Sequence, residues 1–115
     1  MATPTNAKSY ADDAPLTVLL GTSARARILS AFVAERGRDL STSDVARFAG
    51  LARSTVYEHL DTLLELGVIV HTRDTQAGHS PRYQLDEEND VATKLYELEG
   101  VTLRRLLELD GHLEP

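Results

Sequence analysis

Three short amphipathic segments, each followed by a glycine, succeed one another in the middle of the chain and limit its fold more than any other feature. Apolar residues recur at intervals of three and four within each segment, which is the spacing of one face of an α-helix. Glycine readily adopts the left-handed conformation that ends a helix, so the pattern predicts three short helices in series. The segments span residues 22–36, 43–49 and 53–66, and the glycines that follow them are Gly37, Gly50 and Gly67.

Hydroxyl residues and a carboxylate mark where the first two helices begin. Thr22 or Ser23 can cap the first helix, and the run Ser41-Thr42-Ser43-Asp44 supplies hydroxyl caps and an early carboxylate for the second. The residues expected to be buried are Ile28, Leu29, Phe32 and Val33 in the first helix, Val45, Ala46 and Ala49 in the second, and Val56, Leu60, Leu63 and Leu64 in the third.

The rest of the chain predicts a hairpin and one long helix. Two segments rich in strand-forming residues, Val68–Arg73 and Arg82–Leu85, flank a polar loop that contains Gly78 and Pro81. This arrangement is typical of a β-hairpin. A helical pattern then runs from Glu88 to about Asp110.

The expected elements follow the order of a winged helix-turn-helix, which is helix, short helix, glycine-containing turn, third helix and hairpin. We therefore expect one mainly α domain with a small β-hairpin (α+β class), extended by a long C-terminal helix. Residues 1–15 are polar and lack periodicity, which predicts a flexible N-terminal tail. Residues 16–85 are the expected winged helix-turn-helix domain, and residues 86–115 the expected acidic C-terminal helix.

The charge of the chain is unevenly distributed. The net charge is −6, and the basic residues are ten arginines and only two lysines. Residues 25–82 hold eight arginines and seven acidic residues, whereas residues 86–115 hold three basic and nine acidic residues. A globally acidic chain argues against nonspecific coating of nucleic acid, because phosphate affinity comes from a positive surface. Here the excess negative charge lies outside the helix-turn-helix region.

Several classes of protein are disfavoured by what the sequence lacks. There is no cysteine, which excludes disulfides and thiolate metal sites. No apolar run approaches the roughly 20 residues of a membrane span, and the N-terminus has no signal-peptide pattern, so we expect a cytoplasmic protein. No nucleophile elbow, phosphate loop or zinc-protease spacing occurs. We therefore expect that the protein is not an enzyme and has no cofactor. His71 and His79 have only Asp74 nearby, so we expect no metal site.

The turn between the second and third helices carries a resemblance to a known family. Ala46 and Gly50 suit the close approach of two helices, with Leu51 and Val56 as apolar contacts on either side. The motif Ser-Thr-Val-x-x-His-Leu-x-x-Leu-x-x-x-Gly at Ser54–Gly67, with Arg27-Ile-Leu upstream and Arg82-Tyr-x-Leu downstream, resembles winged-helix transcriptional regulators of the MarR/ArsR/PadR-like superfamily. The chain departs from that pattern at Ala52, where a capping hydroxyl is common, and in the acidic character of the third helix.

The resemblance implies that the third helix enters the major groove of DNA and that the hairpin is a wing beside it. Polar residues on the expected outer side of the helix are then the readers of base edges and phosphates, and those around the hairpin tip are the wing contacts. The helix residues are Arg53, Ser54, Thr55, Tyr57 and Glu58, and the wing residues are Arg73, Gln76, His79, Ser80 and Arg82. His59 is expected to pack at the junction of helix and wing. The alternative is that these residues form an ordinary solvated surface.

The C-terminal helix has more apolar surface than one small domain can cover. Beyond a main stripe it carries Tyr96, Val101, Leu103 and Leu107, so its second half is apolar on several sides. We expect this helix to form a homodimer; the alternative is that it folds back over its own core. The expected interface residues are Leu95, Leu98, Thr102, Leu106 and Leu109.

These features predict a homodimeric regulator, acting mainly as a repressor that occludes pseudo-palindromic promoter DNA. The composition, poor in lysine and rich in acidic residues, resembles that of proteins from salt-loving archaea, although high genomic GC content also favours arginine over lysine. With such a source, inorganic cations bound near Glu58 and Asp61 would make DNA binding tolerant of salt or stronger in it. The alternative function is a winged-helix module that binds proteins without reading DNA. The sequence identifies neither the inducing signal nor the operator.

Overall fold

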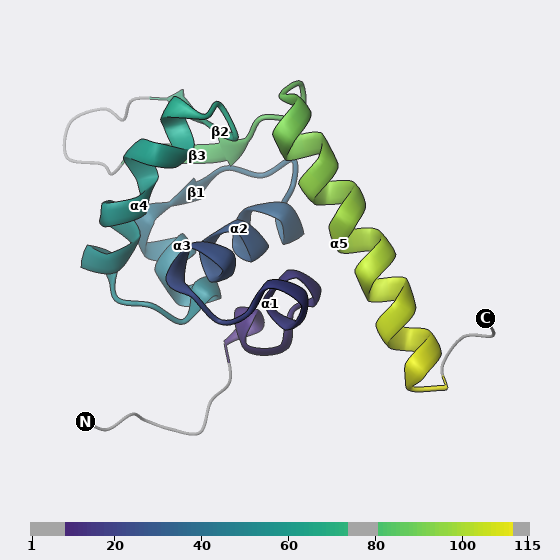
Figure 1. The fold of residues 1–115 in the computed structure, drawn as a ribbon. Coiled ribbons are helices and arrows are strands. Elements are labelled where there is room, and N and C mark those ends of the chain that lie inside the picture. Colours follow the sequence, from purple (N-terminus) through teal and green to yellow (C-terminus); the bar gives the residue numbers. More distant parts are fainter. Residues whose placement is uncertain (1–8, 74–80, 112–115) are drawn as a thin grey trace.

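The computed structural model describes residues 9–73 and 81–111 and contains a winged helix-turn-helix with a long helix along one side (Figure 1). The elements in chain order are a 3-10 turn η1 (Tyr10–Asp13), α1 (Pro15–Leu20), α2 (Ala24–Ala34), β1 (Leu40–Ser41), α3 (Thr42–Ala49), α4 (Arg53–Glu65), β2 (Ile69–Arg73), β3 (Arg82–Leu85) and α5 (Asp90–Leu109). The mainly α fold with a small antiparallel sheet is as the sequence predicts.

The core lies where α2, α3 and α4 meet the sheet. Each of the three helices contributes its predicted apolar face, and the sheet contributes residues from every strand. Only Leu29 and Leu64 of the predicted set are partly rather than fully buried. The central residues are Ile28, Phe32, Val33, Leu40, Val45, Val56, Leu60, Leu63, Ile69, Tyr83 and Leu85. Burial of such side chains stabilises a domain by about 1.5–3 kcal/mol each.

The turn between α3 and α4 has the geometry that its residues predict. The Ser41 hydroxyl accepts from the Asp44 amide (3.1 Å) while the Asp44 carboxylate accepts from the Ser41 amide (3.0 Å), which closes a capping box at the start of α3. The amides of Gly50 and Leu51 both donate to the carbonyl of Ala46. Gly50 has φ +74°, a conformation that favours glycine. Ala52 begins α4 without a side-chain cap.

The sheet contains a strand that the sequence did not predict. Its order is β1-β3-β2, and all pairs are antiparallel. The residues of β1 pair with β3 as Leu40 with Tyr83 and Ser41 with Arg82. Two residues are too few to show the alternation of apolar and polar residues that marks a strand in a sequence. The strand β1 is defined only by its pairing with β3.

The prediction of a flexible tail over residues 1–15 is wrong for its second half. Residues 9–15 are ordered against the helix-turn-helix: Ala11 is fully buried, and Asp12 pairs with Arg27 of α2. Arg27 Nη2 also donates to Ser9 Oγ (3.0 Å). Small polar residues give no hydrophobic period, so contacts made through one alanine and one ion pair leave no pattern in the sequence.

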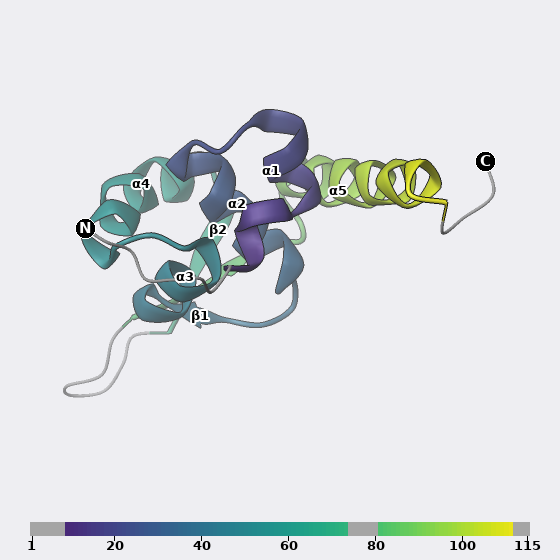
Figure 2. The ribbon, with the colours of Figure 1, turned by 90° about the horizontal axis from the view of Figure 1, so that it is seen from below.

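The helix α5 crosses the side of the domain and then extends beyond it (Figure 2). It contacts α1 and α2, but Ala92 is its only fully buried residue. Arg36, just after the end of α2, lies over the ring of Tyr96, 3.9 Å from its centroid. Helical periodicity places Ala92 and Tyr96 on the side facing the domain. The opposite side leaves apolar residues exposed, namely Val91, Leu98 and Leu109.

Candidate nucleic-acid interface

The helix α4 exposes the face that the sequence assigns to DNA. Arg53, Ser54, Tyr57 and Glu58 are exposed, and Thr55 is half-buried. On the other side of the helix, Val56, Leu60 and Leu63 are at most 3% exposed. The five polar residues therefore occupy the outer side of the first two turns of α4, where their side chains are accessible to a ligand.

The wing strands lie beside this face. The pKa of Tyr83 on β3 is raised. Burial is the largest cause, and negative charge on Tyr57 and Asp61 adds to it. The ring of His71 on β2 lies 5.2 Å from that of Tyr83, between centroids. His71 is itself exposed and Tyr57 is 50% exposed. His71 and Tyr83 thus form an aromatic pair across the wing strands, which sequence reasoning missed because the two residues are 12 positions apart.

Most of the predicted wing contacts fall at the edge of the described chain. The backbone of Arg73 pairs with that of Arg82, at a point where the register between β2 and β3 shifts. Gln76, His79 and Ser80 lie outside the described residues. The two strands therefore supply the base of the expected wing.

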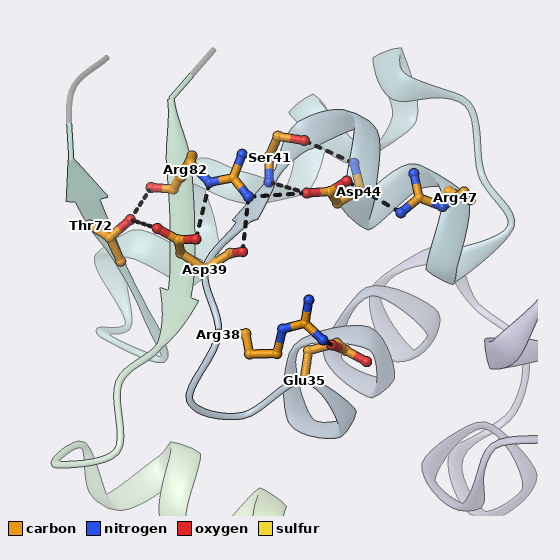
Figure 3. A network of polar contacts seen from close by, with 8 residues as sticks. All are labelled: Glu35, Arg38, Asp39, Ser41, Asp44, Arg47, Thr72 and Arg82. Carbon is orange, nitrogen blue, oxygen red and sulfur yellow. Dashed lines mark hydrogen bonds and ion pairs between the residues drawn. The ribbon is translucent and has the colours of Figure 1, made fainter. Parts of the chain in front are cut away.

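Arg82 belongs to a network of polar contacts within the chain (Figure 3). Its Nε donates to Asp39 Oδ1 at 3.0 Å, and its Nη2 donates to the Asp39 carbonyl at 3.3 Å and to Asp44 Oδ2 at 3.5 Å. The hydroxyl of Thr72 on β2 lies 3.3 Å from Asp39 Oδ2 and 3.2 Å from the Arg82 carbonyl. The side chain of Arg82 is only 33% exposed, so this arginine is held within the chain rather than extended toward solvent.

The network also affects the acidity of Asp44. Partial burial acts to raise the pKa of this carboxyl, but hydrogen bonds from Ser41 and the positive charges of Arg47 and Arg82 outweigh it and lower the pKa. Asp44 was predicted only as a capping residue, and Asp39 was not singled out at all. The partner of Asp39 is 43 residues away along the chain, so local sequence carries no signal for the pair.

His59 does not lie where the sequence places it. Its Nδ1 accepts a hydrogen bond from Arg25 Nε at 3.1 Å, so it packs against the start of α2. The expected position at the junction of helix and wing is wrong. The motif defines the helix position of His59 but not which neighbouring element it meets.

The acidic character of α4 is visible on its surface. Glu58, Asp61 and Glu65 are all exposed. In residues 9–73 and 81–111, no three His, Asp or Glu side chains come together in a way that could hold a metal ion. Within the same residues, no helix is long and apolar enough to cross a membrane.

Comparisons with known proteins agree with this geometry. Residues 26–73 match the IclR helix-turn-helix domain. The fold is similar to a possible transcriptional regulator from Methanosarcina mazei Go1, with a TM-score of 0.54 and 19% identity over 90% of this chain and 88% of that one. It is also similar to the adhesin competence repressor of Streptococcus pyogenes, with a TM-score of 0.52 and 20% identity over 80% of this chain and 74% of that one.

The comparison with curated proteins found no match. The domain match together with the fold supports a DNA-binding transcriptional regulator of the winged helix-turn-helix type. The matched domain is of the IclR type, so a closer relation to the MarR, ArsR or PadR regulators stays a prediction. A source in a salt-loving archaeon also stays a prediction.

Proposed function

We propose that the chain is a sequence-specific transcriptional regulator that binds pseudo-palindromic promoter DNA as a homodimer and acts mainly by occluding it. The observation that carries the proposal is the exposed polar face at the start of α4, which lies beside a winged sheet and opposite a buried apolar face. A helix presented in this way fits the major groove, with the wing over the neighbouring minor groove.

Each polar residue of that face suits a contact with DNA. Arg53 fits a guanine edge or a phosphate, and Ser54 and Thr55 fit phosphates or bases. Tyr57 offers a hydroxyl and a flat ring, and Glu58 can accept from the amino group of cytosine. At the wing we propose contacts from Arg73, Gln76, His79 and Ser80. The guanidinium of Arg82 binds Asp39 and Asp44, so this residue is left out of the set of DNA contacts.

A fluorescence titration with genomic DNA fragments tests the proposal. Some fragments should bind at least 1,000-fold more tightly than unrelated DNA of equal length, as is typical of specific sites. Arg53→Ala should weaken binding to those fragments about tenfold, because it removes a charge-assisted contact. Arg104→Ala, which removes an exposed arginine of α5, is the matched control and should bind as the wild type does. Equal affinity for all fragments would contradict the proposal of sequence-specific recognition.

The free side of α5 supports a homodimer. Val91, Leu98 and Leu109 are exposed by 51%, 38% and 64%, and Val91, Leu95 and Leu98 line an open apolar groove of about 350 Å³. On the adjoining α1, Val18, Leu19 and Leu20 are each at least half exposed. Apolar surface of this extent on a small monomer is typical of an interface with another chain. Of the predicted interface residues, Leu98 and Leu109 are exposed, whereas Leu95, Thr102 and Leu106 are half-buried by the chain itself, Leu95 against the core.

A two-fold dimer would direct two α4 helices toward the same face of DNA. Their separation should be one helical turn, about 34 Å, which selects inverted half-sites at that spacing. Binding of this kind covers promoter DNA, and we therefore propose repression as the main outcome.

The acidic residues of α4 support a further proposal about salt. Glu58 and Asp61 would lie near phosphates and repel them unless cations intervene. Cations bound between carboxylates and phosphates would screen this repulsion, so affinity would fall little with salt or even rise. The measurement is log affinity against log salt concentration. A slope as steep as that of ordinary regulators, about −0.9 per phosphate contact, would contradict salt tolerance.

A protein-binding module is the second candidate function. The observation that favours it is the same acidic surface, since Glu58, Asp61 and Glu65 outnumber Arg53 among the charged residues of α4. Such a module would show no preference among DNA fragments at any salt concentration. The fluorescence titration therefore separates the two functions.

A further inference from the structure

Asp39 lies where the wing meets the helix-turn-helix. It precedes β1, and its side chain is 24% exposed. One carboxylate oxygen accepts from Arg82 Nε on β3 at 3.0 Å, and the other from Thr72 Oγ1 on β2 at 3.3 Å. A single carboxylate therefore binds both strands of the wing, as Figure 3 shows.

Arg82 continues this connection to the first turn of α3. Its Nη2 donates to the backbone carbonyl of Asp39 and to Asp44 Oδ2, and the same Asp44 oxygen accepts from the Ser41 amide that begins α3. The planar guanidinium presents its donors at fixed angles, so contacts to three acceptors set the orientation of β3 relative to α3.

The sheet itself holds the wing only weakly at this end. β1 contributes two residues, and the register of β2 shifts between His71 and Arg73, a type of irregularity that bends a strand. Few backbone hydrogen bonds therefore resist rotation of the two wing strands about β1. The side chains of Asp39 and Arg82 cross this weak point.

We propose that Asp39 is a positioning residue which, with Asp44 and through Arg82, sets the angle of the wing relative to α4. Arg82 then acts on DNA through the wing rather than by contacting a phosphate. The proposal rests on the proposed DNA-binding function. It predicts that removing the negative charge of Asp39 weakens DNA binding. Simple electrostatics predicts the opposite, because removing a negative charge near DNA would by itself strengthen binding.

Asp39→Asn tests this sign. Asparagine keeps the shape of the side chain but loses the ionic contact with Arg82, so affinity for the selected DNA should fall about tenfold. The matched control is Glu35→Gln, which removes a carboxylate of similar exposure that pairs with Arg38 (3.2 Å) instead of the wing. The control should bind as tightly as the wild type or slightly more so. Binding by Asp39→Asn that equals or exceeds that of the wild type would overturn the proposal.

Arg82→Lys separates positioning from phosphate contact. Lysine keeps the positive charge that a phosphate needs but has no planar fork to reach Asp39 and Asp44 together. We expect this variant to lose about as much affinity as Asp39→Asn, with an unchanged dependence on salt, and the double variant to lose little more than either. Affinity close to that of the wild type would overturn the proposal.

Hydrogen exchange in the free protein gives a readout that needs no DNA. In Asp39→Asn, the backbone amides of β2 and β3 should exchange at least several-fold faster than in Glu35→Gln, while the amides of α2 and α4 keep their protection. Unchanged exchange in the strands would overturn the positioning role. Absence of DNA binding by the wild type would instead overturn the proposed function, so the two failures are distinguishable.

Discussion

Arg27 joins three parts of the chain that lie far apart in the sequence. Its Nε donates to the carbonyl of Ala49 at 2.7 Å, at the end of α3, while its Nη2 contacts Asp12 of η1 and Ser9 just before it. The side chain is only 13% exposed, so these contacts are better shielded from water than a surface ion pair. The sequence motif includes Arg27 because of its neighbours Ile28 and Leu29, and gives no indication of the partners of its guanidinium.

Replacement of Arg27 should therefore cost more stability than replacement of a surface arginine. We expect Arg27→Ala to lower the free energy of unfolding by about 2 kcal/mol, since it leaves the Ala49 carbonyl and Asp12 without their donor. Urea denaturation measures the change. Arg38→Ala is the control, because Arg38 is 75% exposed, and it should change stability by less than about 0.5 kcal/mol. Equal losses in the two variants would contradict the role of Arg27.

At the level of elements, the helices α2, α3, α4 and α5 were predictable, whereas the short α1 and the lateral partners of the helices were not. Helix α4 depends on its own apolar period and on Gly67, so its bounds agree with expectation within one residue. By contrast, β1 depends on a partner strand about 40 residues later, and η1 depends on the burial of Ala11 and on contacts with Arg27 of α2. Within the candidate site, the exposed face of α4 was predictable from the same period. The network of Asp39, Arg82 and Asp44 was not, because it is formed entirely by contacts between distant segments.

The capping box of α3 predicts a loss of stability in acid. The pKa of Asp44 is lowered from an ordinary value of 3.8, so its stabilisation is fully present above that pH and is lost as pH falls through the lower folded-state pKa. Asp44→Asn should therefore lose less stability than the wild type between pH 5 and about pH 2, measured by thermal unfolding. Some acid sensitivity should remain, because a hydrogen bond from Arg27 lowers the pKa of Asp12 as well.

Glu97→Gln on α5 serves as the control for this experiment, since Glu97 is 56% exposed and pairs with Lys94 one turn earlier on the same helix. Its dependence on pH should match that of the wild type. If the stability of Asp44→Asn also depended on pH as the wild type does, the capping box would not depend on the charge of Asp44.

At the level of the whole molecule, α5 has two apolar sides and the domain covers only one. Ala92 and Tyr96 face α1 and α2, whereas Val91, Leu98 and Leu109 lie on the uncovered side. The sequence pattern indicated that the helix needs burial on more than one side, but it does not say which side its own domain takes. Of the stripe that the sequence assigns to a partner, Leu98 and Leu109 are exposed, whereas Leu95 packs partly against the core of the domain.

Leu98→Glu should convert a dimer to monomers, because it places a charge in the middle of the uncovered apolar side. Light scattering across a range of concentrations measures the mass. Arg104→Glu also adds negative charge to α5, at a residue 69% exposed and away from the apolar stripe, and should remain dimeric. A mass for Leu98→Glu equal to that of the wild type would remove this side of α5 from the interface.

Selection of bound sequences from a random DNA pool, with the wild type and Tyr57→Ala side by side, tests the central claim most directly. The wild type should select two inverted half-sites whose centres lie about 10 base pairs apart. Tyr57→Ala should keep that spacing and select a different base within each half-site, because we propose that the exposed face of α4 reads the sequence. Selection of no sequence by the wild type, or of the same half-site by both proteins, would contradict it.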